Sequence, residues 1–258
     1  MIKRIAIITG ASSGIGKEFA YILAKDDTLD EIWAIARNRQ RLGELKQNLS
    51  DKIRIFSMDL TDRKNIDVIQ QLLYNENPDI KYLINSAGFA KFCDYADISK
   101  EVCVNMIDLN ASALVALCTL CIPYMHRGAH IINMASQAAF QPVPYQNVYS
   151  ATKAFVRSYT RALNVELKNK DVCATAVCPG WMNTRLIERG FTGAAKATNK
   201  FPFMAEPYFV AQKAINDAQK NKDMSVYSPV IKLSHLLSKL LPQRLLMKVW
   251  LKQQDIMP

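Results

Sequence analysis

The sequence lacks the features that divide a chain into separate domains. It has no linker rich in proline, glycine or serine, no low-complexity tract and no internal repeat, although 258 residues would suffice for two small domains. Apolar segments typical of strands alternate instead with amphipathic, helix-like stretches along most of the chain. We therefore expect one continuous domain over residues 1–229, followed by an extension over residues 230–258.

The sequence also has little that would indicate disulfides, a metal site or secretion. The first residues run straight into an apolar strand and leave no room for a signal peptide, so we expect a cytoplasmic protein whose six cysteines are reduced. Cys118 and Cys121 form a C-x-x-C pair inside an apolar run, with no second pair or histidine at ligand spacing. This pattern predicts core packing and no metal.

Acidic residues are the scarcer charged type. The chain has 33 lysines and arginines against 23 aspartates and glutamates, a formal net charge of +10. This excess favours an anionic partner, which could be a phosphate-bearing cofactor, a lipid surface or a nucleic acid. Because no nucleic-acid-binding motif is present, we expect no nucleic acid partner.

Six short apolar segments are typical of strands buried on both faces. Separated by helix-like stretches, they predict an α/β fold with a doubly wound parallel sheet. The predicted strands are residues 5–8, 32–36, 53–57, 82–85, 130–134 and 173–177. In such sheets ligands bind beyond the carboxyl ends of the strands, so the loops there should carry the chemistry.

The first of these loops reads TGASSGIG and leads into a helix-like stretch. Glycines there let the backbone approach a ligand, and the N–H groups at the start of a helix favour a pyrophosphate. The order Gly10, Gly14, Gly16 departs from G-x-G-x-x-G, and a glycine-rich turn without a ligand is the alternative.

Arg37 follows the second predicted strand, where an NAD site usually has an acid that holds the ribose 2′-hydroxyl. A guanidinium fits a 2′-phosphate through charge-assisted hydrogen bonds. The sequence therefore predicts NADP(H) over NAD(H).

Tyr149 and Lys153 lie four residues apart on a predicted helix and so share one face. A neighbouring ammonium stabilises a phenolate and should lower the pKa of the tyrosine, which would make it a usable acid. Ser136, at the end of the preceding predicted strand, could orient a substrate carbonyl. Tyr145 is a rival, but no lysine stands four residues after it.

Together with TGASSGIG and Ser136, the segments NSAG (85–88), YSATK (149–153) and CPGWMNT (178–184) resemble the short-chain dehydrogenase/reductase family over residues 3–229. The resemblance implies a single-domain Rossmann-type fold and a homodimer or homotetramer. Its one departure is NSAG where NNAG is commoner. The implied catalytic residues are Ser136, Tyr149 as proton donor and acceptor, Lys153, and Asn110 holding a water behind the lysine. The implied cofactor-binding residues are Gly10, Ser12, Ser13, Gly14, Ile15, Gly16, Arg37, Asp59, Leu60, Asn85, Ala87, Gly88, Tyr149, Lys153, Pro179, Gly180, Met182 and Thr184.

The lid segment, residues 181–205, is expected to cover the site. Its apolar residues predict an apolar substrate such as a steroid or a fatty-acyl lipid, and Gly190 and Gly193 are possible hinges. Some of the aromatic residues could simply pack against the sheet. The segment also contains Arg185, Arg189, Lys196 and Lys200, which could attract a carboxylate or a phosphopantetheine-bearing carrier, although we expect most of them to be solvated.

The tail after residue 229 is basic and amphipathic, and Pro242 breaks it in two. It has five lysines and arginines against one acid, Asp255. It is too interrupted to span a bilayer. It could lie on an anionic membrane, close the substrate pocket or form a dimer interface.

These patterns predict an NADP(H)-dependent oxidoreductase that interconverts a ketone and a secondary alcohol on an apolar substrate. Two alternatives are a non-catalytic NADP-binding regulator and a 3-oxoacyl thioester reductase. The intact set of Ser136, Tyr149 and Lys153 argues against a pure binding protein.

Overall fold

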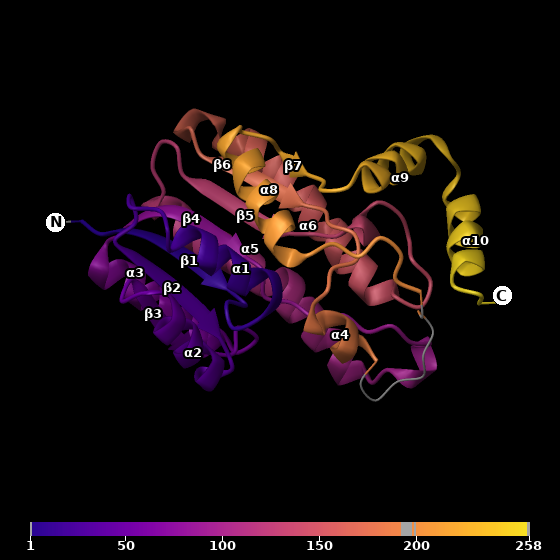
Figure 1. The fold of residues 1–258 in the computed structure, drawn as a ribbon, viewed down its shortest axis with the longest axis horizontal. Coiled ribbons are helices and arrows are strands. Elements are labelled where there is room, and N and C mark those ends of the chain that lie inside the picture. The colour runs from indigo at the N-terminus through magenta and orange to yellow at the C-terminus, as the bar shows by residue number, and fades with distance from the viewer. Residues whose placement is uncertain (1, 192–197, 199, 257–258) are drawn as a thin grey trace.

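A computed structural model describes residues 2–191, 198 and 200–256 of the chain. Its centre is a seven-stranded parallel sheet with the strand order β3-β2-β1-β4-β5-β6-β7 (Figure 1). All six predicted strands are present, and β7 is a two-residue strand that the sequence did not indicate. The strands are β1 Arg4–Thr9, β2 Glu31–Ala36, β3 Ile53–Ser57, β4 Asp79–Asn85, β5 His130–Met134, β6 Cys173–Val177 and β7 Met224–Ser225.

Helices cover both faces of the sheet, as a doubly wound fold requires (Figure 1). Alternate strand residues pack on opposite faces: Ile5 and Ile7 join one core, and Ala6 and Ile8 join the other. This is why β1 reads as an unbroken apolar run. The first core is completed by α3 (Arg63–Glu76), α5 (Ala113–Cys121) and α6 (Asn147–Glu166), and the second by α1 (Gly14–Leu23), α2 (Arg39–Leu49) and α8 (Pro207–Gln219).

The stretch Lys100–Tyr124 is long and apolar enough, by length and composition, to cross a membrane. It comprises α4 (Lys100–Ile107), a π-helical turn at Asp108–Ser112, α5 and a short 3₁₀ turn. Leu117, Cys118 and Cys121 on α5 are buried in the first core, so this face packs against the sheet.

Cys118 and Cys121 are core residues, as the sequence predicts. Both are buried free thiols, and burial raises the pKa of Cys118 to about 12. Within the described ranges, no group of three or more histidine, cysteine, aspartate or glutamate residues could hold a metal ion.

The tail forms two helices, α9 (Pro229–Leu240) and α10 (Gln243–Gln253), and the break falls at Pro242 as predicted. Figure 1 shows both helices at the end of the molecule far from the N-terminus. Ile231 on α9 and Leu246 on α10 are buried and anchor the tail to the rest of the fold.

Candidate active site

The glycine turn after β1 has a backbone that side chains would obstruct. Gly10 and Gly14 have φ values of +68° and +55°, in the left-handed region. A Cβ on Gly16 would lie 2.4 Å from the carbonyl oxygen of Gly10, and one on Gly10 would lie 3.0 Å from the backbone of Ala87. All three glycines are therefore required by the local geometry.

Ser86 joins this turn to the loop after β4. The Thr9 hydroxyl oxygen accepts hydrogen bonds from the N–H groups of Ser86 and Ala87, each at 3.0 Å, and the Ser86 hydroxyl donates to the Thr9 carbonyl. The serine of NSAG thus makes a direct link between the two central strands.

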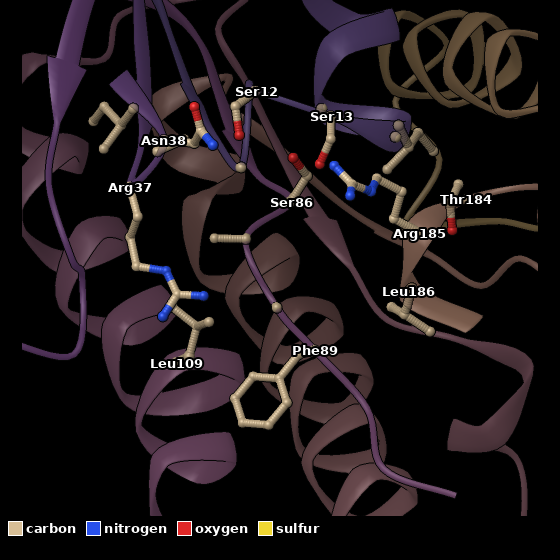
Figure 2. A pocket seen from close by; sticks show the side chains of 18 of the residues that line it. Ser12, Ser13, Arg37, Asn38, Ser86, Phe89, Leu109, Thr184, Arg185 and Leu186 are labelled. Carbon is tan, nitrogen blue, oxygen red and sulfur yellow. The ribbon is translucent and has the colours of Figure 1, made fainter. Parts of the chain in front are cut away.

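These strands form the point where the strand order reverses, and the first cavity, of about 410 Å³, opens at their carboxyl ends (Figure 2). The loops after β1, β2, β3 and β4 all contribute to it. Of the residues expected to bind a cofactor, it is lined by Gly10, Ser12, Ser13, Gly14, Ile15, Gly16, Arg37, Asp59, Leu60, Ala87, Gly88, Met182 and Thr184.

Arg37 lies at the rim of the first cavity with its side chain largely exposed. Its Nη1 is 3.5 Å from Oδ2 of Asp59. Burial alone would raise the pKa of Asp59, but hydrogen bonds from Thr61 and the Arg37 guanidinium outweigh it and hold that pKa below its usual value. Asp59 therefore stays ionised and keeps the guanidinium near the cavity.

Sequence reasoning did not place Arg185 and Arg189 here. Both line the first cavity, and neither is among the residues that line the second one described below. Figure 2 shows Arg185 beside Ser13, with Arg37 on the other side of Ser86. The sequence offered one indication of this position, because Arg185 directly follows Thr184, which was expected to bind the cofactor. The first cavity is also lined by Asn38, Met58, Ser86, Phe89, Leu109 and Leu186, all of which flank predicted positions or the loops that carry them.

The second cavity, of about 180 Å³, adjoins the first, because Gly88, Met182 and Thr184 are among the residues that line both. Its walls come from the ends of β5 and β6, from α6 and from the tail. Of the predicted site residues it brings together Ser136, Tyr149, Lys153, Pro179 and Gly180.

Tyr149 and Lys153 are both buried, and Lys153 Nζ lies 5.7 Å from the centroid of the Tyr149 ring. Lys153 Nζ donates to the carbonyl oxygen of Met134 at 2.6 Å, which fixes the ammonium at the end of β5. The Ser136 hydroxyl accepts from the N–H of Ala138 at 3.1 Å. The three predicted catalytic side chains therefore meet at one wall of the second cavity.

The pKa of Tyr149 corrects one expectation. Burial raises it to about 12, and only a hydrogen bond with Ser136 opposes the shift, so the predicted lowering by the ammonium is not seen. Burial also lowers the pKa of Lys153 to about 8. In the fold as it stands desolvation outweighs charge attraction, so Tyr149 carries its proton at neutral pH.

Asn110 lies in the π-helical turn, and its side chain is fully engaged. Its Oδ1 accepts from the N–H of Phe89 at 3.0 Å, while its Nδ2 donates to the Phe89 carbonyl at 3.0 Å and to the Thr152 hydroxyl at 3.2 Å. A Cβ on Gly88 would lie 2.8 Å from Asn110 Oδ1 and 3.7 Å from Lys153 Nζ. Asn110 thus fixes the loop beside the lysine; its holding of a water stays a prediction.

Asn85 is not placed as expected, because its side chain lines neither cavity. It is buried under the β4 loop, where Nδ2 donates to Oδ1 of Asn133 at 2.9 Å and contacts the sulfur of Cys118 at 3.4 Å. Its side chain joins β4 to β5 and α5 and does not face the cofactor site.

The lid segment packs its aromatic residues around Phe92. The ring centroids of Trp181, Phe191 and Phe201 lie 5.7, 5.6 and 6.4 Å from that of Phe92. These aromatics therefore pack in a separate cluster around Phe92 and not against the sheet, as the alternative had expected, whereas Phe203 and Met204 are exposed.

Gly190, expected as a hinge, ends α7 (Arg185–Gly190) under the Phe92 ring. An added Cβ there would lie 2.4 Å from Phe92, so close packing requires the glycine. The expected hinge Gly193 and the lysine Lys196 lie outside the described residues. Lys200 is paired with Asp255 of the tail.

The tail contributes Ser234, Trp250 and Gln253 to the second cavity. Trp250 Nε1 donates to the Pro144 carbonyl at 3.2 Å, and its ring stacks 6.5 Å from that of Trp181. The buried Gln254 side chain accepts from the N–H of Lys200 at 3.0 Å and donates to its carbonyl at 3.1 Å. Of the three roles considered for the tail, closing the pocket is the one that these contacts with the second cavity favour.

Comparisons with known proteins agree with this architecture. The family model described as short chain dehydrogenase matches residues 4–193. An uncharacterized oxidoreductase of Staphylococcus epidermidis is 34% identical over 188 residues, which cover 72% of this chain and 81% of that protein. One of Staphylococcus aureus is 27% identical over 226 residues, covering 86% of this chain and 94% of that protein.

Two solved structures extend the similarity to the whole fold. A short-chain dehydrogenase from Sphingobium yanoikuyae in complex with NADPH has a TM-score of 0.78 and 25% identity, with 96% of each chain covered. The closed form of a serine dehydrogenase complexed with NADP⁺ has a TM-score of 0.75 and 29% identity, with 88% of this chain and 95% of that chain covered. The sequence motifs, the parallel sheet and these matches show that the chain belongs to the short-chain dehydrogenase family.

Proposed function

We propose that the protein is an NADP(H)-dependent oxidoreductase that interconverts a ketone and a secondary alcohol on an apolar substrate. The observation that carries the proposal is the meeting of Ser136, Tyr149 and Lys153 at a cavity that adjoins the larger cavity beside the glycine turn. The larger cavity offers room for a dinucleotide and the smaller one holds the acid–base groups.

The residues around the first cavity fit a nicotinamide dinucleotide. The turn at Gly10 and Gly16 leaves bare backbone where a Cβ would collide, and Ser13 does not cap the start of α1 with its side chain, which leaves N–H groups for a pyrophosphate. When bound, the cofactor would supply or accept the hydride.

One guanidinium group, that of Arg37, supports a preference for the phosphorylated cofactor, and a second could bind the pyrophosphate that both cofactors share. Arg37 stands at the position where an acid would favour NAD(H), and we assign it to the 2′-phosphate. Arg185, beside Ser13, is assigned to the pyrophosphate (Figure 2). The two related structures above that bind NADPH or NADP⁺ support the same choice.

The chain's own acid–base groups suit reduction at neutral pH. Ser136 would orient the substrate carbonyl, and Tyr149, protonated because burial raises its pKa to about 12, would give its proton to the carbonyl oxygen. Lys153, with a pKa of about 8, would be mostly charged and would stabilise the phenolate as it forms. In the oxidative direction the same groups would take up a proton.

The walls of the second cavity support an apolar substrate. Val143, Trp181, Leu186 and Trp250 line it, together with a few amide side chains that could fix one polar end. Because Arg185 and Arg189 line the first cavity instead, the second offers no arginine to a thioester carrier.

The test is NADPH oxidation by the purified protein with steroid ketones, 3-oxoacyl thioesters and small aldehydes. We expect turnover with apolar ketones and its loss in Tyr149→Phe. Tyr145→Phe is the matched control, because Tyr145 lies on the neighbouring loop and lines neither cavity. Equal loss in both variants, or NADPH binding without turnover of any ketone, would count against the proposal.

A further inference from the structure

Helix α9 presents its apolar side chains away from the protein. Val230, Leu233, Leu237 and Leu240 recur at helical spacing, and each is at least 40% exposed. The opposite side of the helix faces the fold: Ile231 is buried and His235 stacks on Phe140 with ring centroids 4.3 Å apart. A helix of a globular protein normally buries its leucines, so this orientation requires a partner.

The exposed stripe continues on α10. Leu245 and Val249 lie four residues apart on α10 and are each 45% exposed, and Leu241, just after the end of α9, is 37% exposed. Leu246 and Trp250, on the other side, are held in the fold. Seven of the exposed large apolar side chains of the described residues lie on the two helices and an eighth, Leu241, lies between them: Val230, Leu233, Leu236, Leu237, Leu240, Leu241, Leu245 and Val249.

Basic residues border this apolar surface. Lys232 and Lys239, seven residues apart, lie on one side of the stripe on α9, while Arg244, Lys248 and Lys252 form an i, i+4 row beside the stripe on α10. No aspartate or glutamate occurs between Asp223 and Asp255. Cationic chains alongside leucines can extend toward phosphates while the leucines enter an apolar phase.

We propose that α9 and α10 form a docking surface for an anionic lipid bilayer. The positive charge of this surface favours an anionic bilayer over a second copy of the chain. In a symmetric contact with a second copy the same surface meets itself, so five cations would oppose five cations without a carboxylate between them. An anionic bilayer satisfies the cations and the leucines together.

The docking surface lies on the outer side of helices whose inner side lines the second cavity. Ser234 and Trp250 reach that cavity from α9 and α10. The pocket would thus lie close to the lipid surface, and its substrate would be a lipid ketone or alcohol drawn from the bilayer. This second step rests on the proposed function; the docking itself does not.

The test is flotation of the full chain with vesicles of phosphatidylcholine alone and of phosphatidylcholine mixed with phosphatidylglycerol. We expect binding to the anionic vesicles only, weakened by salt. In Leu233→Gln/Leu240→Gln binding should fall at least about tenfold, because both leucines would leave the apolar phase. The control Val68→Gln/Tyr74→Gln changes side chains of α3 that are 45% and 78% exposed and should bind as the parent does.

A charge variant tests the basic border separately. Lys232→Gln/Lys239→Gln should weaken binding by about fivefold for each removed charge at low salt. Lys100→Gln/Arg127→Gln, at two side chains that are 85% and 88% exposed elsewhere, should leave it unchanged.

Three results would overturn the proposal: no binding to anionic vesicles, equal binding to neutral ones, or unaltered binding by the leucine variant. A smaller oligomer of that variant in light scattering, without vesicle binding by the parent, would assign the surface to a second copy. NADPH oxidation with a water-soluble ketone is measured on the same samples and reports the proposed function independently.

Discussion

The two cavities of the candidate active site are built in different ways. The first cavity is formed by short loops after β1 to β4, where an added Cβ on Gly16 would collide with backbone. The second cavity is lined in part by residues 181–187 and by the tail, which is held by separate contacts such as Trp250 with Pro144 and Gln254 with Lys200. The backbone turn of the first cavity should tolerate few substitutions. In the second cavity, single side chains of the wall can be replaced one at a time.

Among the substitutions that alter the shape of the two cavities, Gly16→Ala should have the largest effect. Its Cβ would lie 2.4 Å from Gly10 O, so the turn must move, and we expect NADPH affinity to fall at least about tenfold with a loss of about 1–3 kcal/mol in the free energy of unfolding. Titration of NADPH and thermal melting measure both. Gly43→Ala is the control, because nothing lies within 4 Å of its Cβ and it sits in a helix. If both variants behave alike, the close approach is not what the turn requires.

Arg37→Asp should change the affinity for the cofactor and no other property. The loss of a charge-assisted hydrogen bond predicts that NADPH binds about tenfold more weakly or worse, with little change for NADH. Arg39→Asp, an exposed neighbour that lines neither cavity, is the control. If the affinities for NADPH and NADH fell equally, Arg37 would not bind the 2′-phosphate.

Trp250→Ala tests the second cavity separately from the first. It removes an aromatic wall of the second cavity, so we expect KM for an apolar ketone to rise about tenfold while NADPH affinity stays unchanged. Steady-state kinetics and NADPH titration separate the two quantities. Val249→Ala, next to it and 45% exposed, should have no effect on KM. A fall in NADPH affinity instead would show that the tail supports the first cavity.

The smallest effect should be that of pH. Burial lowers the pKa of Lys153 to about 8, so the ammonium is present below that pH and is lost as the pH rises through it. Ketone reduction should therefore decline above about pH 8, while NADPH binding measured on the same samples marks any change in the cofactor site. A rate that rises through this range would contradict the assigned role of the ammonium.

The parts of the site that could be predicted from the sequence are those formed by residues close together in the chain. The glycine turn, Arg37 and the Tyr149–Lys153 pair are local patterns, because each lies within one turn or one helix. They lie around two adjoining cavities, and the six predicted strands are all present.

Other parts depend on tertiary packing that spacing does not reveal. Trp250 reaches the second cavity from a helix about a hundred residues after Tyr149, and β7 has only two residues. The side chain of Asn85 turns into the interior because Asn133 and Cys118 lie there. The raised pKa of Tyr149 follows from burial, which the sequence pattern cannot give.

The most direct test of the central claim is label transfer from NADPH in which both hydrogens on the reactive nicotinamide carbon are replaced by deuterium. With an apolar ketone, the account predicts product with deuterium on the carbinol carbon from the parent protein. Tyr149→Phe should bind NADPH with the same affinity and form at least about a hundredfold less product. Product without the label, or equal product from Tyr149→Phe, would contradict the account.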